Sequence, residues 1–223
     1  MIITVDGPAG AGKSTVARAL ARRLGFLYLD TGAMYRAVAL GGMRRKVDWN
    51  RPEQLAQLAG RLRIELADDR VFLDGEDVTE ALRSAEVTAV TRYAADNPAV
   101  RRHLVELQQA AARRRDVVTE GRDQGSVVFP EAECKIYLTA GTEERARRRL
   151  RDFEAQGEAR PLEEVLADIN RRDREDASRA VGPLVRAAGA VELQTDGMSV
   201  EEVMDRLEAV VRRCQKNPGR ESV

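Results

Sequence analysis

The feature that most constrains this chain is a glycine-rich segment near its N-terminus, Gly7-Pro8-Ala9-Gly10-Ala11-Gly12-Lys13-Ser14. It follows the apolar run at residues 2–5 and precedes a helical pattern at residues 15–24. A strand, a glycine-rich turn and a helix in this order direct backbone N–H groups at phosphate oxygens, and the helix N-terminus adds partial positive charge. The order therefore predicts a P-loop that binds a nucleoside triphosphate.

Two side chains of this loop carry charge or metal chemistry. We expect Lys13 to reach the β- and γ-phosphates of ATP and the Ser14 hydroxyl to hold Mg²⁺. The predicted ATP-binding residues are Gly7, Pro8, Ala9, Gly10, Ala11, Gly12, Lys13, Ser14 and Thr15.

Composition excludes several other classes of protein. The formal net charge of the 223 residues is zero, which argues against a general nucleic-acid or membrane-surface binder. No apolar run approaches the ~18 residues that a membrane span requires. The first strand-like run begins at Ile2 and leaves no room for a targeting segment, while Cys134 and Cys214 are the only cysteines. We therefore expect a cytoplasmic protein in a reducing compartment.

Strand-like and helical patterns alternate along the chain. This alternation predicts an α/β fold, a P-loop three-layer sandwich with a five-stranded parallel sheet. Ligands of such sheets bind beyond the carboxyl ends of the strands. The predicted strands are residues 2–5, 26–29, 117–119, 134–139 and 190–195.

An insertion and a lid interrupt this alternation. Apolar and polar residues alternate at 63–66, 70–73 and 76–78, with turns at Asp68-Asp69 and Asp74-Gly75, which predicts a small antiparallel meander. Residues 142–179 carry many arginines on two helices that flank a polar hairpin at 155–158. For different arginines we expect solvated ion pairs or a helical lid that closes over phosphates.

These patterns divide the chain into four parts. We expect a P-loop core at 1–38, 112–150 and 180–216, an acceptor-binding insertion at 39–111, a lid at 151–179 and a flexible tail at 217–223.

Three further segments place arginines at the carboxyl edge of the sheet or on the lid. They are residues 29–36, 120–125 and 171–179, and in the last of these Arg172, Asp176 and Arg179 have the spacing of one helical face. Such arginines suit a second phosphate group. A phosphate monoester has a second pKa of ~6, so as an acceptor it is already an anionic nucleophile and needs no general base.

Four motifs together resemble the bacterial cytidylate kinase family. They are residues 6–14, 30–36 and 121–130 and the run from Arg172 to Leu184. The resemblance covers nearly the whole chain and implies transfer of the ATP γ-phosphate to CMP or dCMP with Mg²⁺. It implies Lys13, Arg122 and Arg179 as catalytic residues, and a monomer whose partners are these small molecules, without nucleic acid or membrane.

Carried over by motif, Arg36, Arg122 and Arg179 hold the acceptor phosphate, while Arg101 and Asp123 read the cytosine. A carboxylate can accept from the N4 amino group of cytosine. The role of Glu120, where several relatives have aspartate, stays open, as does that of Thr91. The implied CMP-binding residues are Thr31, Tyr35, Arg36, Arg101, Arg122, Asp123, Arg172, Asp176 and Arg179.

Two alternatives make different demands on the sequence. A kinase for UMP or AMP has the same fold, but uracil presents a carbonyl where cytosine has its amino group, and that carbonyl would be repelled by Asp123. A GTPase switch needs an Asn-Lys-x-Asp segment, and no asparagine of this chain is followed by lysine.

Overall fold

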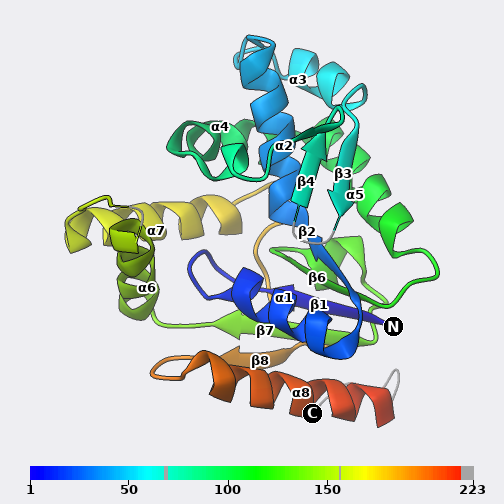
Figure 1. The fold of residues 1–223 in the computed structure, drawn as a ribbon, viewed down its shortest axis with the longest axis vertical. Coiled ribbons are helices and arrows are strands. Elements are labelled where there is room, and N and C mark those ends of the chain that lie inside the picture. The colour runs from blue at the N-terminus through cyan, green and yellow to red at the C-terminus, as the bar shows by residue number, and fades with distance from the viewer. Residues whose placement is uncertain (68–69, 156, 217–223) are drawn as a thin grey trace. The chain divides into compact units, whose positions relative to one another are not determined.

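The computed structural model describes residues 1–67, 70–155 and 157–216. It divides into two compact units, one formed by Met1–Tyr28 with Asp116–Val223 and the other by Leu29–Arg115 (Figure 1). Among the described residues, no helix combines the length and apolar character needed to cross a bilayer. The predicted turn at Asp68-Asp69, Gln156 of the predicted hairpin and the predicted tail at 217–223 lie outside the described residues.

The first unit is built on a five-stranded sheet with the order β2-β6-β1-β7-β8. Its central strand pairs in parallel with β6 and β7, placing Thr4 opposite both Thr119 and Lys135. The predicted five-stranded parallel sheet is confirmed. The strands are β1 (Ile2–Asp6), β2 (Leu27–Asp30), β6 (Val117–Gly121), β7 (Cys134–Thr139) and β8 (Val191–Gln194).

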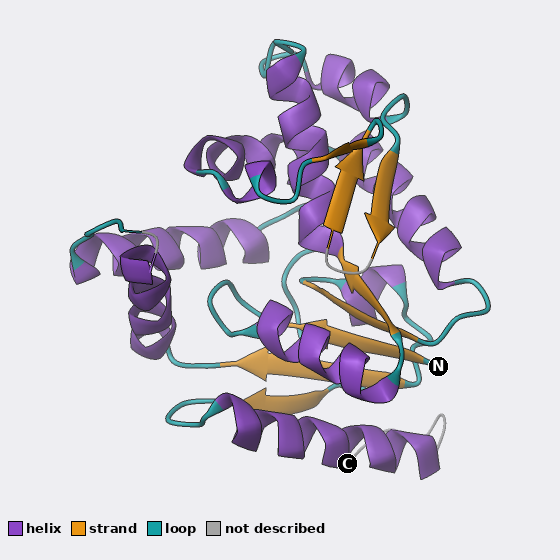
Figure 2. Cartoon of the chain, viewed as in Figure 1, coloured by secondary structure: helices purple, strands orange, loops and turns teal. Residues whose placement is uncertain are grey.

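Helices α1 (Lys13–Leu24) and α8 (Val200–Lys216) share an apolar core with this sheet (Figure 2). Helix α8 contributes Val203, Leu207 and Val211 at intervals of four residues, so that one face is apolar. Cys134 and Cys214 are free thiols in this core, with Sγ atoms 2.7 Å apart.

Two helices of the first unit carry most of the arginines of the predicted lid. They are α6 (Thr142–Ala155) and α7 (Leu162–Ala177), and they pack on each other through Ala146, Val165 and Ile169. This apolar contact is small, whereas charged side chains cover the outer faces of both helices. Closure of the lid stays a prediction. A short helical turn, η2 (Gln124–Val128), follows β6.

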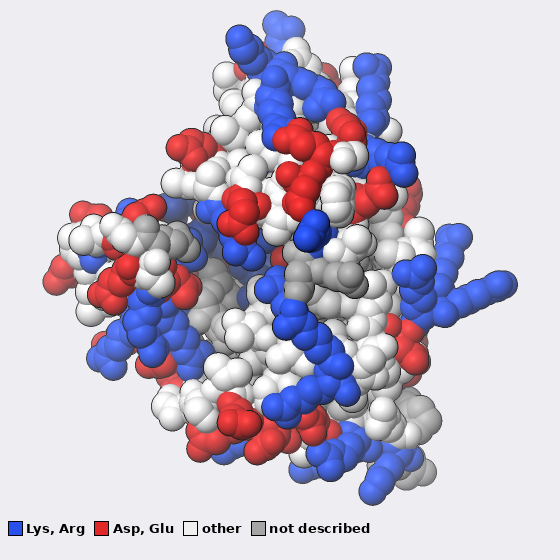
Figure 3. Space-filling view, viewed as in Figure 1, with Lys and Arg blue, Asp and Glu red and all other residues white. Residues whose placement is uncertain are grey.

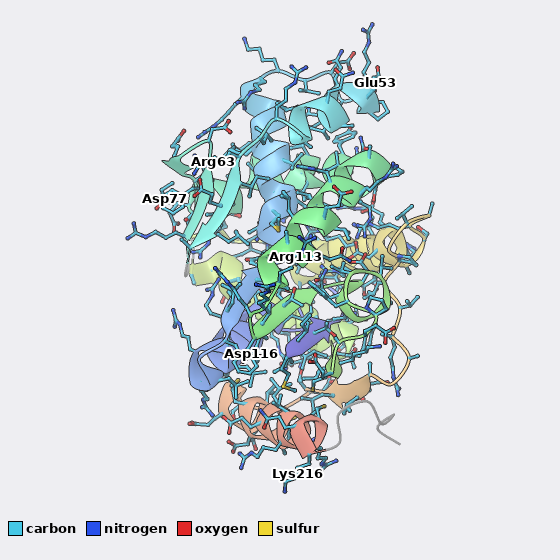
Figure 4. All side chains as sticks on the ribbon, turned by 90° about the vertical axis from the view of Figure 1, so that its right-hand side faces the viewer. Glu53, Arg63, Asp77, Arg113, Asp116 and Lys216 are labelled. Carbon is cyan, nitrogen blue, oxygen red and sulfur yellow. The ribbon has the colours of Figure 1, made fainter. Side chains whose placement is uncertain are left out.

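The second unit is helical with a small antiparallel sheet of order β3-β4-β5. Ile64 lies opposite Leu73, as the predicted meander requires. Arg63, directly before β3, and Asp77 of β5 are exposed (Figure 4). Its elements are α2 (Thr31–Arg44), α3 (Pro52–Ala59), β3 (Ile64–Ala67), β4 (Arg70–Leu73), β5 (Glu76–Asp77), η1 (Ala81–Arg83), α4 (Ala85–Ala95) and α5 (Pro98–Ala112).

Side-chain caps explain where the main helices of the second unit begin. The Asp30 side chain accepts from the N–H of Ala33 at α2, and the Ser84 hydroxyl accepts from Val87 at α4. Asn97 accepts from two N–H groups of α5, whose first residue is Pro98. Each cap satisfies N–H groups that have no partner within the helix. The caps therefore fix the starts of α2 and α5, which carry predicted site residues.

The chain leaves and re-enters the first unit at neighbouring points. The N–H of Leu27 donates to the carbonyl of Asp116 at 2.9 Å, so the residues that flank the second unit in sequence are hydrogen-bonded neighbours. The second unit is therefore an insertion between adjacent strand positions of the first.

Candidate functional site

The P-loop takes its shape from glycine geometry. Gly7 has φ of +151°, and a Cβ atom there would lie 1.9 Å from the Leu138 carbonyl oxygen. Gly12 is left-handed, with φ of +89°, and is the N-cap of α1. Only glycine fits both positions without strain. The loop thus wraps at the N-terminus of a helix, the geometry that the sequence motif predicts.

Lys13 is buried at the start of α1 and is 5% exposed. Its Nζ donates to the Pro8 carbonyl at 2.8 Å across the loop. Burial and the charge of Arg122 together lower the pKa of Lys13 to about 7, against the opposite effect of Glu120. Lys13 and Arg122 are therefore electrostatic neighbours, two cations close together in one unit.

Ser14 and Glu120 form an oxygen pair beside the loop. The Ser14 hydroxyl donates to Glu120 Oε1 at 2.6 Å, and the Tyr28 hydroxyl donates weakly to the same oxygen at 3.4 Å. Tyr28 was not among the predicted site residues, because alternation in a strand gives no sign of such a contact. Glu120, whose role the sequence left open, thus lies against the predicted metal residue.

This oxygen pair is the feature against which the expected Mg²⁺ can be tested. Mg²⁺ prefers hard oxygen ligands and is held by one or two protein oxygens together with substrate phosphates and water. Ser14 and Glu120 fit that role. Across the described part of the chain, no group of three or more His, Cys, Asp or Glu side chains could hold a metal ion by itself. The metal that these residues fit is therefore one that arrives with a phosphate.

Asp176 joins two of the predicted arginines. Its Oδ2 lies 2.7 Å from Arg122 Nε, and its Oδ1 lies 2.6 Å from Arg179 Nη2. Burial raises the pKa of Asp176, but the charges of Arg122 and Arg179 outweigh that effect, so the net shift is downward. The carboxylate is thus ionised at neutral pH and orients both guanidinium groups.

The prediction that Arg172, Asp176 and Arg179 share one helical face is wrong for Arg179. Helix α7 ends at Ala177, where the N–H of Ser178 donates to the Arg174 carbonyl and closes the last turn. Gly182 and Pro183 follow within a few residues and do not favour a continued helix. Arg179 therefore reaches Asp176 from the segment past the helix.

The loop after β6 is anchored to the end of β1. Asp6 accepts the backbone N–H groups of Gln124 at 2.9 Å and of Gly125 at 2.7 Å. Burial raises the pKa of Asp6 to about 6, although both hydrogen bonds act to lower it. Asp123, predicted to read the base, is itself buried in this loop. Asp6 and Gln124 lay in the quoted motifs but were not among the predicted site residues.

The arginines of α6 and α7 behave in two ways. Arg145 is 4% exposed and donates to the Ala9 carbonyl of the P-loop at 3.1 Å, while pairing with Asp173 of α7 at 2.7 Å. Arg148 donates to the Thr195 carbonyl at 2.6 Å. By contrast, Arg171 forms exposed ion pairs with its own helix. Arg171 fits the expected solvated ion pairs, whereas a lid that closes its arginines over phosphates stays a prediction.

Four predicted acceptor residues lie in the second unit. Thr31, Tyr35 and Arg36 occupy the first turns of α2, where Arg36 pairs with Asp30 at 3.4 Å. The guanidinium of Arg101, on α5, lies 5.6 Å from the ring centroid of Tyr35. The structure thus brings Tyr35 and Arg101 together.

Thr91, whose role the sequence left open, uses its hydroxyl within α4. It donates to the Val87 carbonyl at 2.7 Å. The remaining predicted residues belong to the first unit, where they lie in the P-loop, the loop after β6, α7 and the segment past α7. The predicted acceptor residues are therefore divided between the two units.

Surface charge is mixed rather than concentrated. Lys and Arg side chains intersperse with Asp and Glu over the face shown in Figure 3. With a formal net charge of zero, this face offers no broad field of one sign of the kind that a nucleic-acid backbone attracts.

Comparison with known proteins gives a consistent result. The family model described as cytidylate kinase matches residues 3–213. A cytidylate kinase of Rhodopirellula baltica is 50% identical over 214 residues, covering 96% of this chain and 93% of the relative. A cytidylate kinase of Pelotomaculum thermopropionicum is 52% identical over 214 residues, covering 94% and 95%.

A solved structure of an uncharacterized protein from Eubacterium ventriosum shares the fold. It has a TM-score of 0.51 at 10% identity and covers 95% of this chain and 98% of that one. The family model and the close relatives settle the family, and the chain belongs to the cytidylate kinases.

Proposed function

We propose that this protein transfers the γ-phosphate of ATP to CMP or dCMP, giving ADP and CDP or dCDP. The observation that carries the proposal is the ion-pair cluster in which Asp176 holds both Arg122 and Arg179. The charges of Arg122 and Asp176 also act on the pKa of Lys13. A triphosphate loop that merely binds ATP has no need of a second set of cations. Arg122 and Arg179, both held by Asp176, suit the phosphate of an acceptor.

The transfer needs positioning and charge stabilisation more than proton transfer. The acceptor phosphate is largely a dianion at neutral pH, so its oxygen attacks the γ-phosphorus without a general base. Lys13, Arg122 and Arg179 then stabilise the charge that spreads over the moving phosphoryl group. His103, the sole histidine of the sequence, lies on α5 and has no part in this scheme.

We further propose that Ser14, with Glu120 beside it, holds Mg²⁺ that arrives with ATP. Held by these residues, the metal would neutralise part of the charge of the triphosphate. The backbone of residues 7–15 holds the remaining phosphate oxygens through N–H groups.

The acceptor base is read by a carboxylate and a guanidinium in the proposed scheme. Asp123 accepts from the N4 amino group of cytosine, and Arg101 donates to O2 and N3. Arg36 adds a third contact to the acceptor phosphate, Thr31 and Tyr35 line its site, and Arg172 with Asp176 lies by the sugar. A sugar contact of this kind accepts CMP and dCMP alike.

The proposed organisation follows from these roles. Residues 39–111 bind the acceptor, residues 151–179 close over the nucleotides, and the core at 1–38, 112–150 and 180–216 holds ATP. We propose a cytoplasmic protein that is a monomer. Size-exclusion chromatography with light scattering measures the molar mass and tests the monomer.

The deciding experiment is a coupled assay of ADP release with CMP, dCMP, UMP or AMP as acceptor. Turnover with CMP or dCMP well above turnover with the other two is expected. A turnover with UMP equal to that with CMP contradicts the cytosine assignment, and ADP release that needs no acceptor contradicts the kinase reaction. UMP and AMP remain the alternative acceptors, and no contact among the described residues favours them.

A further inference from the structure

The first strand ends in a buried carboxylate that the proposed reaction does not use. Asp6 is the last residue of β1, lies directly before the P-loop and is only 2% exposed. Its two oxygens accept one N–H each, from Gln124 at 2.9 Å and Gly125 at 2.7 Å. A carboxylate is costly to bury, so its place here needs a compensating role.

These N–H groups belong to the start of η2, where a helical turn leaves donors without partners of its own. Asp6 supplies the missing acceptors from a strand 118 residues away in sequence. The approach is close, because a Cβ atom on Gly125 would lie 2.8 Å from Thr4 Oγ1 and 3.4 Å from Asp6 Oδ2. The absence of a side chain at Gly125 therefore leaves the space in which the Asp6 carboxylate accepts the Gly125 N–H.

The anchored segment begins directly after the two residues proposed to contact the acceptor. Arg122 and Asp123 lie between β6 and the N–H groups that Asp6 accepts. The Arg122 side chain is held separately by Asp176, and the Gln124 side chain accepts from the Thr119 hydroxyl at 2.9 Å. Asp6 thus holds the backbone of this loop to the strand that leads into the P-loop.

We propose that Asp6 is a positioning residue that fixes Arg122 and Asp123 relative to the P-loop, so that one rigid edge holds both nucleotides. The inference rests on the proposed function, because it assumes that these two residues contact CMP. Asp6 itself touches no substrate in this scheme. Its loss therefore affects the acceptor through the loop and leaves the ATP-binding backbone in place. It also removes one of the negative charges that raise the pKa of Lys13, an effect on the P-loop that KM for ATP reports.

The test is Asp6→Asn, which keeps the shape but turns an NH₂ group toward one of the two N–H donors. We expect KM for CMP to rise about 10-fold and kcat to fall about 10-fold, since small misplacements of reacting groups are costly. KM for ATP should stay within about 2-fold of the unchanged chain. Equal losses for CMP and ATP, or unchanged CMP kinetics, overturn the inference.

Val5→Ala is the matched control. Val5 is the neighbouring buried residue of β1, and its truncation weakens packing without touching the two hydrogen bonds. It should lower the melting temperature while leaving the ratio of the two KM values unchanged. If Val5→Ala reproduces the CMP-specific loss, the effect of Asp6 is general destabilisation and the inference fails.

Amide hydrogen exchange provides a readout that does not depend on activity. Exchange at Gln124 and Gly125 should quicken by at least ~10-fold in Asp6→Asn but not in Val5→Ala, because an amide exchanges when its hydrogen bond opens. Asp6→Glu, which keeps the charge but lengthens the side chain, takes its place if Asp6→Asn does not fold. Absence of CMP phosphorylation by the unchanged chain refutes the proposed function, whereas unchanged exchange in the folded variant refutes the role of Asp6.

Discussion

The P-loop and the Arg122–Asp176–Arg179 cluster are both suited to phosphate, but they are built in different ways. The P-loop uses consecutive residues and presents its backbone, so its shape depends on glycine geometry at positions such as Gly7. The cluster uses side chains from segments 54 residues apart and depends on one shared carboxylate. The first is a local structure that sequence encodes directly, whereas the second exists only once the fold has formed.

The largest loss of turnover is expected at Lys13, the P-loop residue whose pKa is affected by the charges of Arg122 and Asp176. Lys13→Met removes the cation of the P-loop while leaving its backbone intact, so turnover should fall about 10³-fold. ATP affinity, measured by calorimetry, should change far less, because the backbone N–H groups remain. A variant that keeps a tenth of normal turnover contradicts the placement of Lys13 at the transferred phosphate.

The cluster offers the next test. Arg179→Ala should lower turnover at least ~10²-fold, as expected for the loss of a charge contact to the transition state. It also leaves Asp176 with one partner instead of two.

Arg171→Ala is the control, because Arg171 is 51% exposed and its ion pairs among the described residues lie within its own helix. Exposed ion pairs contribute little, so turnover should stay within about 2-fold. Similar losses in Arg171→Ala and Arg179→Ala would show that the cluster carries no special role.

A smaller effect is expected on the choice of base. Asp123→Ala should reduce kcat/KM for CMP about 10- to 100-fold, the usual cost of one base contact of ~1–3 kcal/mol. KM for ATP should remain close to normal. Comparable damage to the use of both nucleotides would instead indicate that Asp123 supports the loop.

The smallest effect concerns stability and pH. The pKa of Asp6 is raised to about 6 in the folded chain from 3.8, so ionising this carboxylate opposes folding. This cost is absent below about pH 4 and complete above about pH 6, reaching ~3 kcal/mol at most. The stability advantage of the unchanged chain over Asp6→Asn should therefore shrink as the pH rises from 4 to 6.

Urea unfolding of both chains across this pH range measures the difference. Asp176, whose pKa is lowered, contributes a stability that is lost on acidification, but it does so equally in both chains and cancels. A difference that stays constant with pH shows that Asp6 does not titrate in this range.

Sequence alone predicts much of the fold because the patterns that indicate strands and helices lie within short segments of the chain. The strand predicted at 134–139 matches β7 residue for residue, and the meander and both helices of the lid segment form as expected. Helix ends are less certain, since Arg179 lies beyond α7 even though its spacing from Asp176 suits a helix.

Contacts between distant segments are what the sequence could not show. In the sequence, Asp6 is only the residue after a predicted strand, and Arg145 is only one of many arginines in residues 142–179. The fold adds the hydrogen bond from Gln124 to Asp6 and the one from Arg145 to Ala9. Their roles depend on which backbone groups the fold leaves without partners, and no local pattern records that. The residues that contact CMP remain a prediction from motifs, which kinetics must test.

The hydrogen bond between Leu27 and Asp116 bears on how such a protein diversifies. A segment whose two ends are neighbours on the host sheet can be lengthened, shortened or exchanged without stretching the strands on either side. The acceptor-binding role proposed for residues 39–111 predicts that exchange of this segment alters the choice of acceptor while the P-loop stays as it is. The hydrogen-bonded pair Leu27 and Asp116 thus marks where the chain of the host begins and ends around such an exchange.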